Sequence, residues 1–580
     1  MKKIFTLLFC LASLGASAQQ VNGGFDETWV NCVPWTSKNN TTAQGTQPVD
    51  WCVSNVIGLS GLGATTIASS STGYNNSTYS ATLTNTPNPY MDSQIIPAYI
   101  TLGTTWNTAT SSIFSGVSDQ DGGTFGGKSF NYKPDGIKFY YKRSHGTADT
   151  DEPAVVTAYL WKGTWSQESV PGETKIGTPS TATMTNRDRN ILNMSYTKGG
   201  TVTKTDDAKL LAYLKEGDNK YVSIMGDASE WTEFTYNFTY DDTESKPEMI
   251  NIIIAANDYF GGATAVGSGN SITIDNVELI YNSSLSDLQF KGTTIEGFAK
   301  DTYEYTIEGA YTESCITAIK DCVGGRVVGR FEPSSNSYII TVEGDDYNSN
   351  PSNTHTYTVK FTQVIINDGD DINKVGHISG GTVVLNRTFK AGWNTVCLPF
   401  PVTAARLGSS VTTYTLSTPS GDAITFSKTT SNIAKNTPFL ANFPSEVNSI
   451  TFTSRTINED KTPLVKTCGD WTFTGSYEPS ISMEGKWGVV NNGSKVRKGG
   501  ASSTLKSTRA YLEYNGTANV NEMRIIIDGE ETTITEIDGM PVGNFDVYNL
   551  QGVRVRQNVN NLDGLNKGIY IVNGKKHIVK

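Results

Sequence analysis

The sequence predicts an all-β protein built from several β-sandwiches in tandem. Three observations predict this fold class. Charged residues make up only 18% of the chain, 56 glycines punctuate segments rich in Thr, Ser and Asn, and many short stretches alternate apolar with polar residues. This composition disfavours long amphipathic helices and suits short strands joined by polar turns. At 580 residues the chain is too long for one hydrophobic core, so several domains are expected.

The first 18 residues have the pattern of a signal peptide. Two lysines precede an apolar run from Ile4 to Leu14, and Ala16-Ser17-Ala18 supplies the small residues of a cleavage site before Gln19. The apolar run is too short for a transmembrane helix, and no later segment approaches the length required. The chain is therefore expected to be secreted, either extracellular or on the outer cell surface, with the periplasm as the alternative.

The charge balance argues against two classes of partner. The net charge is −11 and the isoelectric point is near 5.1, which is opposite to the basic footprint of a nucleic-acid-binding protein. No Lys/Arg-rich run is present, so an anionic membrane surface is not an expected partner either.

The cysteines that follow the signal peptide are even in number, which in an exported chain predicts disulfides. Their grouping along the chain suggests one pair in each of three domains. The pairs are Cys32–Cys52, Cys315–Cys322 and Cys397–Cys468. Only four histidines occur, and none lies at ligand spacing from a cysteine, so zinc is not expected.

The region after the signal peptide is dense in tryptophan. Trp29, Trp35 and Trp51 lie within 25 residues of one another. Two interpretations stay open at this point: the rings pack beneath a sheet as core, or they form a platform for a ligand.

The stretch from 121 to 161 is the chemically richest part of the chain. In the segment Ile137–Lys142, period-2 alternation places Ile137, Phe139 and Tyr141 on one face and Lys138, Tyr140 and Lys142 on the other. In the segment 154–161, Ala154, Val156, Ala158 and Leu160 form the apolar face, and Val155, Thr157, Tyr159 and Trp161 form the other. Each strand is thus expected to have one core face and one partly wet face that carries aromatic rings.

Between these two strands, Asp149, Asp151 and Glu152 crowd a connector. They fit a solvated turn, and the alternative is coordination of hydroxyl groups or Ca²⁺. Further along, Asp206–Lys215 is predicted as a helix. The segments 231–240, 249–255 and 271–281 are predicted as strands.

Residues 19–281 resemble the "putative carbohydrate metabolism" (PCMD) domain of secreted Bacteroidetes proteins. The resemblance is carried by NGGFDETW with Pro34-Trp35 and Trp51, by GGTFGGKSFNYKPDGIKFYYKRS, by WTEFTYNFTY and by VGSGNSITIDNVELIY. It implies a jelly-roll-like sandwich related to carbohydrate-binding modules. This copy departs from the pattern by a long segment at 162–205 and a stretched segment at 53–120.

A carbohydrate-binding face needs aromatic rings for the sugars and a few polar groups for their hydroxyls. The candidate ligand-binding residues are Tyr140, Tyr159 and Trp161, with Lys138, Lys142 and Asp151. The resemblance further implies a structural calcium ion where the first and last strands meet, and this is the one cofactor that the sequence suggests. Its expected ligands are Asp26 or Glu27 together with Asp275.

The remainder of the chain divides into three further units. Residues 282–363 resemble a cadherin-like or immunoglobulin-like sandwich, 364–377 are predicted as a linker, and 378–531 form an accessory β domain. Residues 532–580 resemble the C-terminal sorting domain of the type IX secretion system, and Asn573-Gly574 marks a two-residue hairpin turn there. The outer-membrane secretion machinery is therefore an expected partner of the tail.

Three classes of function remain. The first is capture of a polysaccharide or other glycan, and the second is an adhesin or spacer without a small ligand. The third is a glycoside hydrolase, which would need two carboxyl groups roughly 5–10 Å apart. The acids nominated for that role are Asp149, Asp151, Glu152 and Asp275. No Gly-x-Ser-x-Gly elbow is present, and the Gly122–Gly127 loop lacks the ending of a phosphate-binding loop.

Overall fold

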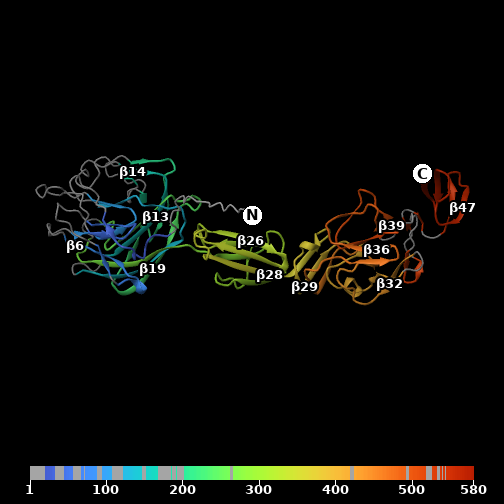
Figure 1. Ribbon diagram of the computed structural model, residues 1–580, viewed down its shortest axis with the longest axis horizontal. Coiled ribbons are helices and arrows are strands. Elements are labelled where there is room, and N and C mark those ends of the chain that lie inside the picture. Colours follow the sequence, from blue (N-terminus) through green and yellow to red (C-terminus); the bar gives the residue numbers. More distant parts are fainter. Residues whose placement is uncertain are drawn as a thin grey trace, which may run out of the picture. The chain divides into compact units, whose positions relative to one another are not determined.

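The structure is a computed structural model, and it confirms an all-β fold (Figure 1). It describes residues 20–579 apart from 33–44, 56–66, 71, 88–94, 108–121, 147–151, 168–183, 186–190, 193–201, 262–265, 419–422, 491–494, 517–524, 532–535, 538–539 and 542–543. The described chain divides into two compact units. Unit 1 contains the residues up to Asp287 together with Ala318–Val327 and Thr341–His355, and unit 2 contains the rest. The predicted division into smaller domains stays a prediction. No helix among the described residues is long and apolar enough to cross a bilayer.

Unit 1 contains one continuous antiparallel sheet of twelve strands among the described residues. One half consists of β3 (Cys52–Val53), β8 (Tyr99–Thr101), β20 (Met249–Ala255), β13 (Ala154–Lys162) and β17 (Lys209–Leu214), with β11 (Lys128–Ser129) beside β20 and β18 (Val222–Ile224) beside β13. The other half consists of β19 (Ala228–Tyr240), β12 (Gly136–Ser144), β21 (Ser271–Ile280), β5 (Ser80–Thr84) and β4 (Ile67–Ser70). The pairing of β17 with β19 joins the two halves.

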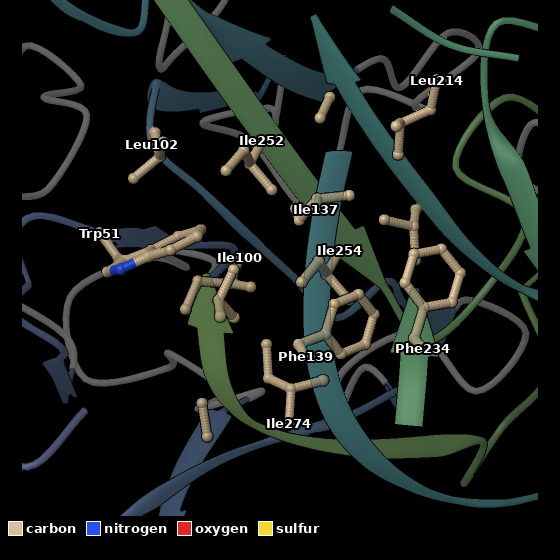
Figure 2. Packing of buried hydrophobic residues seen from close by; sticks show 14 of the residues in the cluster. Trp51, Ile100, Leu102, Ile137, Phe139, Leu214, Phe234, Ile252, Ile254 and Ile274 are labelled. Carbon is tan, nitrogen blue, oxygen red and sulfur yellow. The ribbon is translucent and has the colours of Figure 1, made fainter. Parts of the chain in front are cut away.

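The two halves pack face to face around one hydrophobic core, as in a sandwich. Ile100 and Ile254 from the first half meet Phe139 and Ile274 from the second, and all four are fully buried (Figure 2). Phe139 stacks on Phe234 of the neighbouring strand with 4.6 Å between ring centroids. Each fully buried side chain of this size contributes about 1.5–3 kcal/mol relative to exposure.

Strand β12 follows the predicted alternation. Ile137 and Phe139 are buried in the core, whereas Lys138 and Tyr140 are partly exposed. Trp51 also lies in the core, where its indole Nε1 donates to the Asn22 carbonyl over 2.6 Å. The core interpretation of Trp51 is therefore confirmed; Trp29 packs partly buried against the same cluster, and Trp35 lies outside the described residues.

Strand β13 is buried on both faces, and here the prediction of a wet outer face is wrong. Its outer side chains Val155, Tyr159 and Trp161 belong to a second core cluster rather than to the surface. Residues of the 162–260 region cover them, among them Trp165, Leu192 and Tyr259. Alternation in the sequence cannot reveal a cover that comes from another part of the chain.

The predicted helix Asp206–Lys215 is also wrong. Residues Lys209–Leu214 form strand β17, which pairs with β13 and β19. The segment KLLAYL is buried on both sides, with Leu210 in the outer cluster and Leu214 in the main core. Tertiary pairing between two strands outweighs the helix propensity of Leu and Ala.

The first described residues, from Gln20 to Gly23, close unit 1 against strand β21. The Gln20 side chain donates to the Leu279 carbonyl and accepts from the Leu279 amide, both over 2.8 Å. The Val277 amide donates to the Gly23 carbonyl over 3.0 Å. A Cβ at Gly23 would lie 1.9 Å from the Val277 carbonyl oxygen, so only glycine permits this approach.

Unit 2 contains further sandwich-like sheets. One sheet includes β24 (Glu304–Ala310), β28 (Thr354–Asn367), β29 (Ile378–Asn386) and β34 (Ile450–Ile457). Strand β28 pairs in parallel with both β24 and β29. Val364 and Ile366 are buried in the core of unit 2, and strand β28 runs through Asn367, into the range 364–377 that the sequence predicts as a linker.

Among the described residues, the C-terminal part of unit 2 carries four more sheets, the smallest of which pairs β37 (Ile481–Ser482) with β40 (Thr504–Leu505). One of the larger two has the order β30 (Gly392–Val396), β33 (Phe439–Phe443), β31 (Thr412–Leu416), β32 (Ile424–Thr429), β42 (Ile525–Ile527) and β43 (Glu530–Glu531). The other has the order β35 (Val465–Cys468), β36 (Trp471–Ser476), β41 (Arg509–Tyr514), β38 (Trp487–Val490), β39 (Lys495–Lys498), β44 (Glu536–Ile537) and β45 (Met540–Pro541). The tail forms a four-stranded sheet, and Asn573-Gly574 connects its last two strands as predicted. The strands of the tail are β46 (Phe545–Asn549), β47 (Arg554–Val559), β48 (Gly568–Val572) and β49 (Lys575–Val579).

The predicted disulfides are absent, because all six cysteines of the described chain carry free thiols. Five are buried and Cys52 is half-buried. Burial raises the pKa of Cys32 and Cys322 to about 11, and that of Cys397 to about 12. These thiols therefore behave as small apolar core groups of low reactivity.

We expect the purified chain without its signal peptide to release six titratable thiols on denaturation without reductant. The native protein should react only slowly with a thiol reagent, because five of the six cysteines are buried and the reagent cannot reach them. Titration with Ellman's reagent before and after denaturation measures both quantities. Two, four or six missing thiols would restore the disulfide prediction.

A buried carboxylate fixes three segments of unit 1 to one another. Asp135, which is 8% exposed, accepts the Asn282 amide through Oδ2 and the Val323 amide through Oδ1, each over 2.7 Å. Burial raises the pKa of Asp135 to about 6. The folded state thus binds this proton more tightly than the unfolded chain does.

This raised pKa makes the contribution of Asp135 to the free energy of unfolding decrease as the pH rises. The contribution of Asp135 to the free energy of unfolding is full below its ordinary pKa of 3.8 and falls as the pH rises through about 6. Between about pH 4 and pH 7 we expect Asp135→Asn to gain roughly 3 kcal/mol relative to the wild type. Urea unfolding at both pH values measures this difference. A free-energy difference that does not change with pH would contradict it.

Candidate functional site

Among the described residues, no apolar cluster like the one over β13 lies on the outer surface of the half-sheet β19-β12-β21-β5, which carries a mixed aromatic and charged set of side chains. We call this surface the open face. Because side chains alternate along each strand, the residues that point away from the core follow directly from the register of the buried ones. The open face consists of Lys138, Tyr140, Lys142, Trp231, Glu233, Thr273 and Glu278, together with Tyr74 from the short helix η1 (Tyr74–Asn76). Asp275 of β21 is fully buried and accepts the Tyr74 amide.

Three aromatic rings lie together on the open face. Tyr74 stacks on Tyr140 with ring centroids 3.6 Å apart and planes 11° from parallel. Tyr74 and Trp231 make an edge-to-face contact, with 6.0 Å between their ring centroids. Lys142 places its Nζ 5.2 Å from the centre of the Trp231 ring. All three rings are half-buried, so they form a fixed cluster and keep part of their surface accessible.

Charged groups border this cluster. The Tyr140 hydroxyl donates to Glu233 Oε2 over 2.9 Å, and Thr235 Oγ1 donates to Glu233 Oε1 over 2.9 Å. Lys138 and Glu278 form an ion pair of 3.1 Å between β12 and β21. Hydrogen bonding to Tyr74 and to Glu233 raises the pKa of the Tyr140 phenol, and the hydrogen bond from Tyr140 lowers the pKa of Glu233.

A row of hydroxyl groups continues the open face across β21 and β5. Thr82 and Thr273 lie 3.0 Å apart between their Oγ1 atoms, and Thr84 and Ser271 lie 3.0 Å apart between theirs. These side chains are half-buried. The open face therefore offers aromatic rings, both signs of charge and neutral hydroxyls on adjacent strands.

The structure brings two of the three predicted calcium ligands to one loop. Asp275 accepts the Tyr74 amide and Asp26 accepts the Thr78 amide, each over 2.7 Å, whereas Glu27 is exposed. The carboxylate oxygens thus face N–H donors, which repel a cation. Among the described residues no group of three or more metal-ligating side chains occurs. A calcium ion held by these residues does not fit the arrangement.

The predicted ligand-binding residues separate into three groups. Tyr140 and Lys138 lie on the open face, as predicted. Tyr159 and Trp161 are 0% and 1% exposed, so they cannot present a ring to a ligand and this part of the prediction is wrong. Asp151 lies outside the described residues.

Sequence reasoning missed five members of the open face, which are Tyr74, Trp231, Glu233, Thr273 and Glu278. Trp231 and Glu233 occupy the outward positions of WTEFTYNFTY, because Phe234 and Phe238 are buried in the core. Alternation in that segment was the signal that could have identified them. Tyr74 had no such signal, since it lies in a polar stretch and comes to Tyr140 only through tertiary structure.

Comparisons with known proteins give distant structural similarities. No protein family and no curated protein matches the chain. Among solved structures, a protein from Bacteroides vulgatus ATCC 8482 described as a "putative glycoside hydrolase" is 14% identical, with 37% of this chain and 77% of that chain covered and a TM-score of 0.23. A second protein of that description, from Bacteroides thetaiotaomicron VPI-5482, is 14% identical over 44% and 72% of the two chains, with a TM-score of 0.25.

A third solved structure, a "putative sugar binding protein" from Bacteroides thetaiotaomicron VPI-5482, is 13% identical over 45% of this chain and 97% of that chain, with a TM-score of 0.20. TM-scores of this size do not demonstrate a shared fold. The functional proposal therefore rests on the side chains of the open face.

The contact between Tyr140 and Glu233 gives a testable titration. The Glu233 carboxylate favours the protonated phenol, so we expect Glu233→Gln to lower the pKa of Tyr140. Ultraviolet titration of the phenolate band measures this change, with Tyr140→Phe used to assign the signal. An unchanged titration curve in the variant would show that the two side chains do not interact in solution.

Proposed function

We propose that unit 1 binds a polysaccharide or other glycan chain on the open face, and that the protein serves in glycan capture. The single observation that carries this proposal is the cluster of Tyr74, Tyr140 and Trp231. Tyr140 and Trp231 stand on the paired strands β12 and β19, and Tyr74 of η1 stacks on Tyr140, so three half-exposed rings lie together.

The chemistry of the open face suits a carbohydrate. Aromatic faces pack against the C–H surfaces of pyranose rings, and a few placed polar groups fix their hydroxyls. Glu233 offers acceptor lone pairs, Lys142 offers donors, and the pairs Thr82–Thr273 and Thr84–Ser271 offer hydroxyls that donate or accept.

A glycoside hydrolase is not the function that the described acids favour. Glu152 is buried, and its Oε2 accepts from the Asn270 side chain over 2.7 Å. Asp275 is fully buried and accepts backbone amides. Asp149 and Asp151 lie outside the described residues. An adhesin or spacer without a small ligand is the outcome that remains if no glycan binds.

The proposal includes export of the protein and delivery to the cell surface. It rests on the signal-peptide pattern of residues 1–18 and on the likeness of residues 532–580 to a sorting domain. The four-stranded sheet of the tail, with its small core of Phe545, Val547 and Val572, is the part that would meet the secretion machinery.

A glycan array followed by isothermal titration calorimetry on the secreted chain tests the function. We expect Trp231→Ala and Tyr140→Ala each to weaken binding by roughly tenfold or more, because each removes a ring that contacts the sugar. Tyr303→Ala, which removes an exposed aromatic ring in unit 2, is the matched control and should bind as the wild type does. Absence of any glycan ligand would leave the adhesin or spacer function. Unchanged affinity in both open-face variants would exclude this surface.

A further inference from the structure

The loop that carries Tyr74 has an unusual backbone. Asn75 and Asn76 have φ values of 50° and 71°, in the left-handed region that asparagine tolerates better than most residues. Gly73 precedes them, and a Cβ there would lie 2.7 Å from Asp275 Oδ2 and 2.6 Å from the Ser77 side chain. The loop therefore has to be held in this shape by contacts from outside it.

Two carboxylates from distant parts of the chain supply these contacts. Asp275 of β21 is 0% exposed; its Oδ2 accepts the Tyr74 amide and its Oδ1 accepts the Asn276 amide, both over 2.7 Å. Asp26 comes from the start of the mature chain. Its Oδ1 accepts from Ser77 Oγ over 2.9 Å, from the Thr78 amide over 2.7 Å and from the Tyr79 amide over 3.0 Å.

The hydrogen-bond donors around Asp26 and Asp275 distinguish two possible roles for these carboxylates. They could bind a metal ion, or they could hold the Tyr74 loop in place through hydrogen bonds. A Ca²⁺ ion needs six to eight oxygen ligands whose lone pairs point at it. Here the lone pairs of Asp275 on both oxygens, and those of Asp26 Oδ1, point at N–H and O–H groups. Charge-assisted hydrogen bonds of this kind are among the stronger ones in proteins, and they replace the neutralisation that a cation would give.

We propose that Asp26 and Asp275 form a metal-independent clamp that holds Tyr74 against Tyr140, which makes both acids positioning residues for the glycan-binding face. This inference rests on the proposed function for its role in binding, but the clamp itself is a property of the loop. Through the Tyr74 amide, Asp275 fixes the backbone from which the stacked ring projects.

Hydrogen exchange of the full chain tests the clamp without any ligand. We expect the Tyr74 and Thr78 amides to be protected in the wild type and to exchange at least tenfold faster in Asp275→Asn and Asp26→Asn, respectively. An amide side chain accepts fewer and weaker hydrogen bonds than a carboxylate does. Glu27→Gln is the matched control, because Glu27 is an exposed acid next to Asp26 in the sequence. In this variant, the Tyr74 and Thr78 amides should exchange as they do in the wild type. Equal exchange in the clamp variants and the wild type would overturn the proposal.

The effect of calcium on thermal stability provides a second test of the clamp. Thermal unfolding of the wild type should give the same Tm with calcium chloride as with EDTA, and terbium luminescence should report no site that depends on Asp275. A Tm that rises with calcium in the wild type and in neither clamp variant would overturn the metal-independent clamp and restore the calcium site. In that case Glu27→Gln would also weaken the calcium effect if Glu27 were a ligand.

Glycan affinity provides a third test, which concerns the positioning role of Asp275. If the wild type binds a glycan, Asp275→Asn should weaken binding by about tenfold while Glu27→Gln leaves it unchanged. Normal binding by Asp275→Asn together with fast Tyr74 exchange would overturn the positioning role. If the wild type binds no glycan, the proposed function fails, and hydrogen exchange still decides the clamp. Should Asp275→Asn not fold, Ser77→Ala removes a single hydrogen bond to Asp26 and should show a smaller change in the same direction.

Discussion

The two-sided register of strand β12 is the constraint on which unit 1 depends. β12 pairs with β19 on one side and with β21 on the other, so its register is set twice. A slip by one residue would exchange Phe139, which is buried against Phe234, with Tyr140, which lies on the open face. Burial of one set of side chains therefore fixes where the other set stands, and the site inherits its geometry from the core.

The outer surfaces of the two half-sheets differ in how far they are buried. The outer side of β13 is covered by a second apolar cluster that includes Tyr159 and Trp161. The outer side of β12 and β19 keeps its rings half-exposed and pairs its charges across the strands, as in Lys138–Glu278. Exposed ion pairs of this kind add little to stability.

The sequence allowed part of this picture to be predicted. Alternation correctly divided β12 into core and surface, and it assigned Ile137 and Phe139 to the core. It could not show that inserted residues cover Tyr159 and Trp161, or that Lys209–Leu214 is drawn into a sheet by its neighbours. Periodicity describes one strand at a time, whereas cover and pairing depend on residues far away in the chain.

The same limit applies to the candidate site. Tyr140 and Lys138 were identifiable, because each lies in a clearly alternating strand. Tyr74 and the Asp26 contacts were not, because the partners are separated by about fifty residues or more. The proximity of Asp26 and Asp275 was expected from family resemblance, and the role suggested for them there, metal binding, does not match the donors that surround them.

The contacts of Gln20 with Leu279 and of Gly23 with Val277 have a kinetic consequence. They join residues separated by more than 250 positions, and β21 is also the strand that pairs with both β12 and β5. Unit 1 therefore cannot complete its sandwich until residue 280 has left the ribosome. Contacts of such high sequence separation slow folding, because the loop-closure entropy is lost before the contacts form. Until then, β12 and β5 lack the strand that lies between them, and each has an unpaired edge on that side.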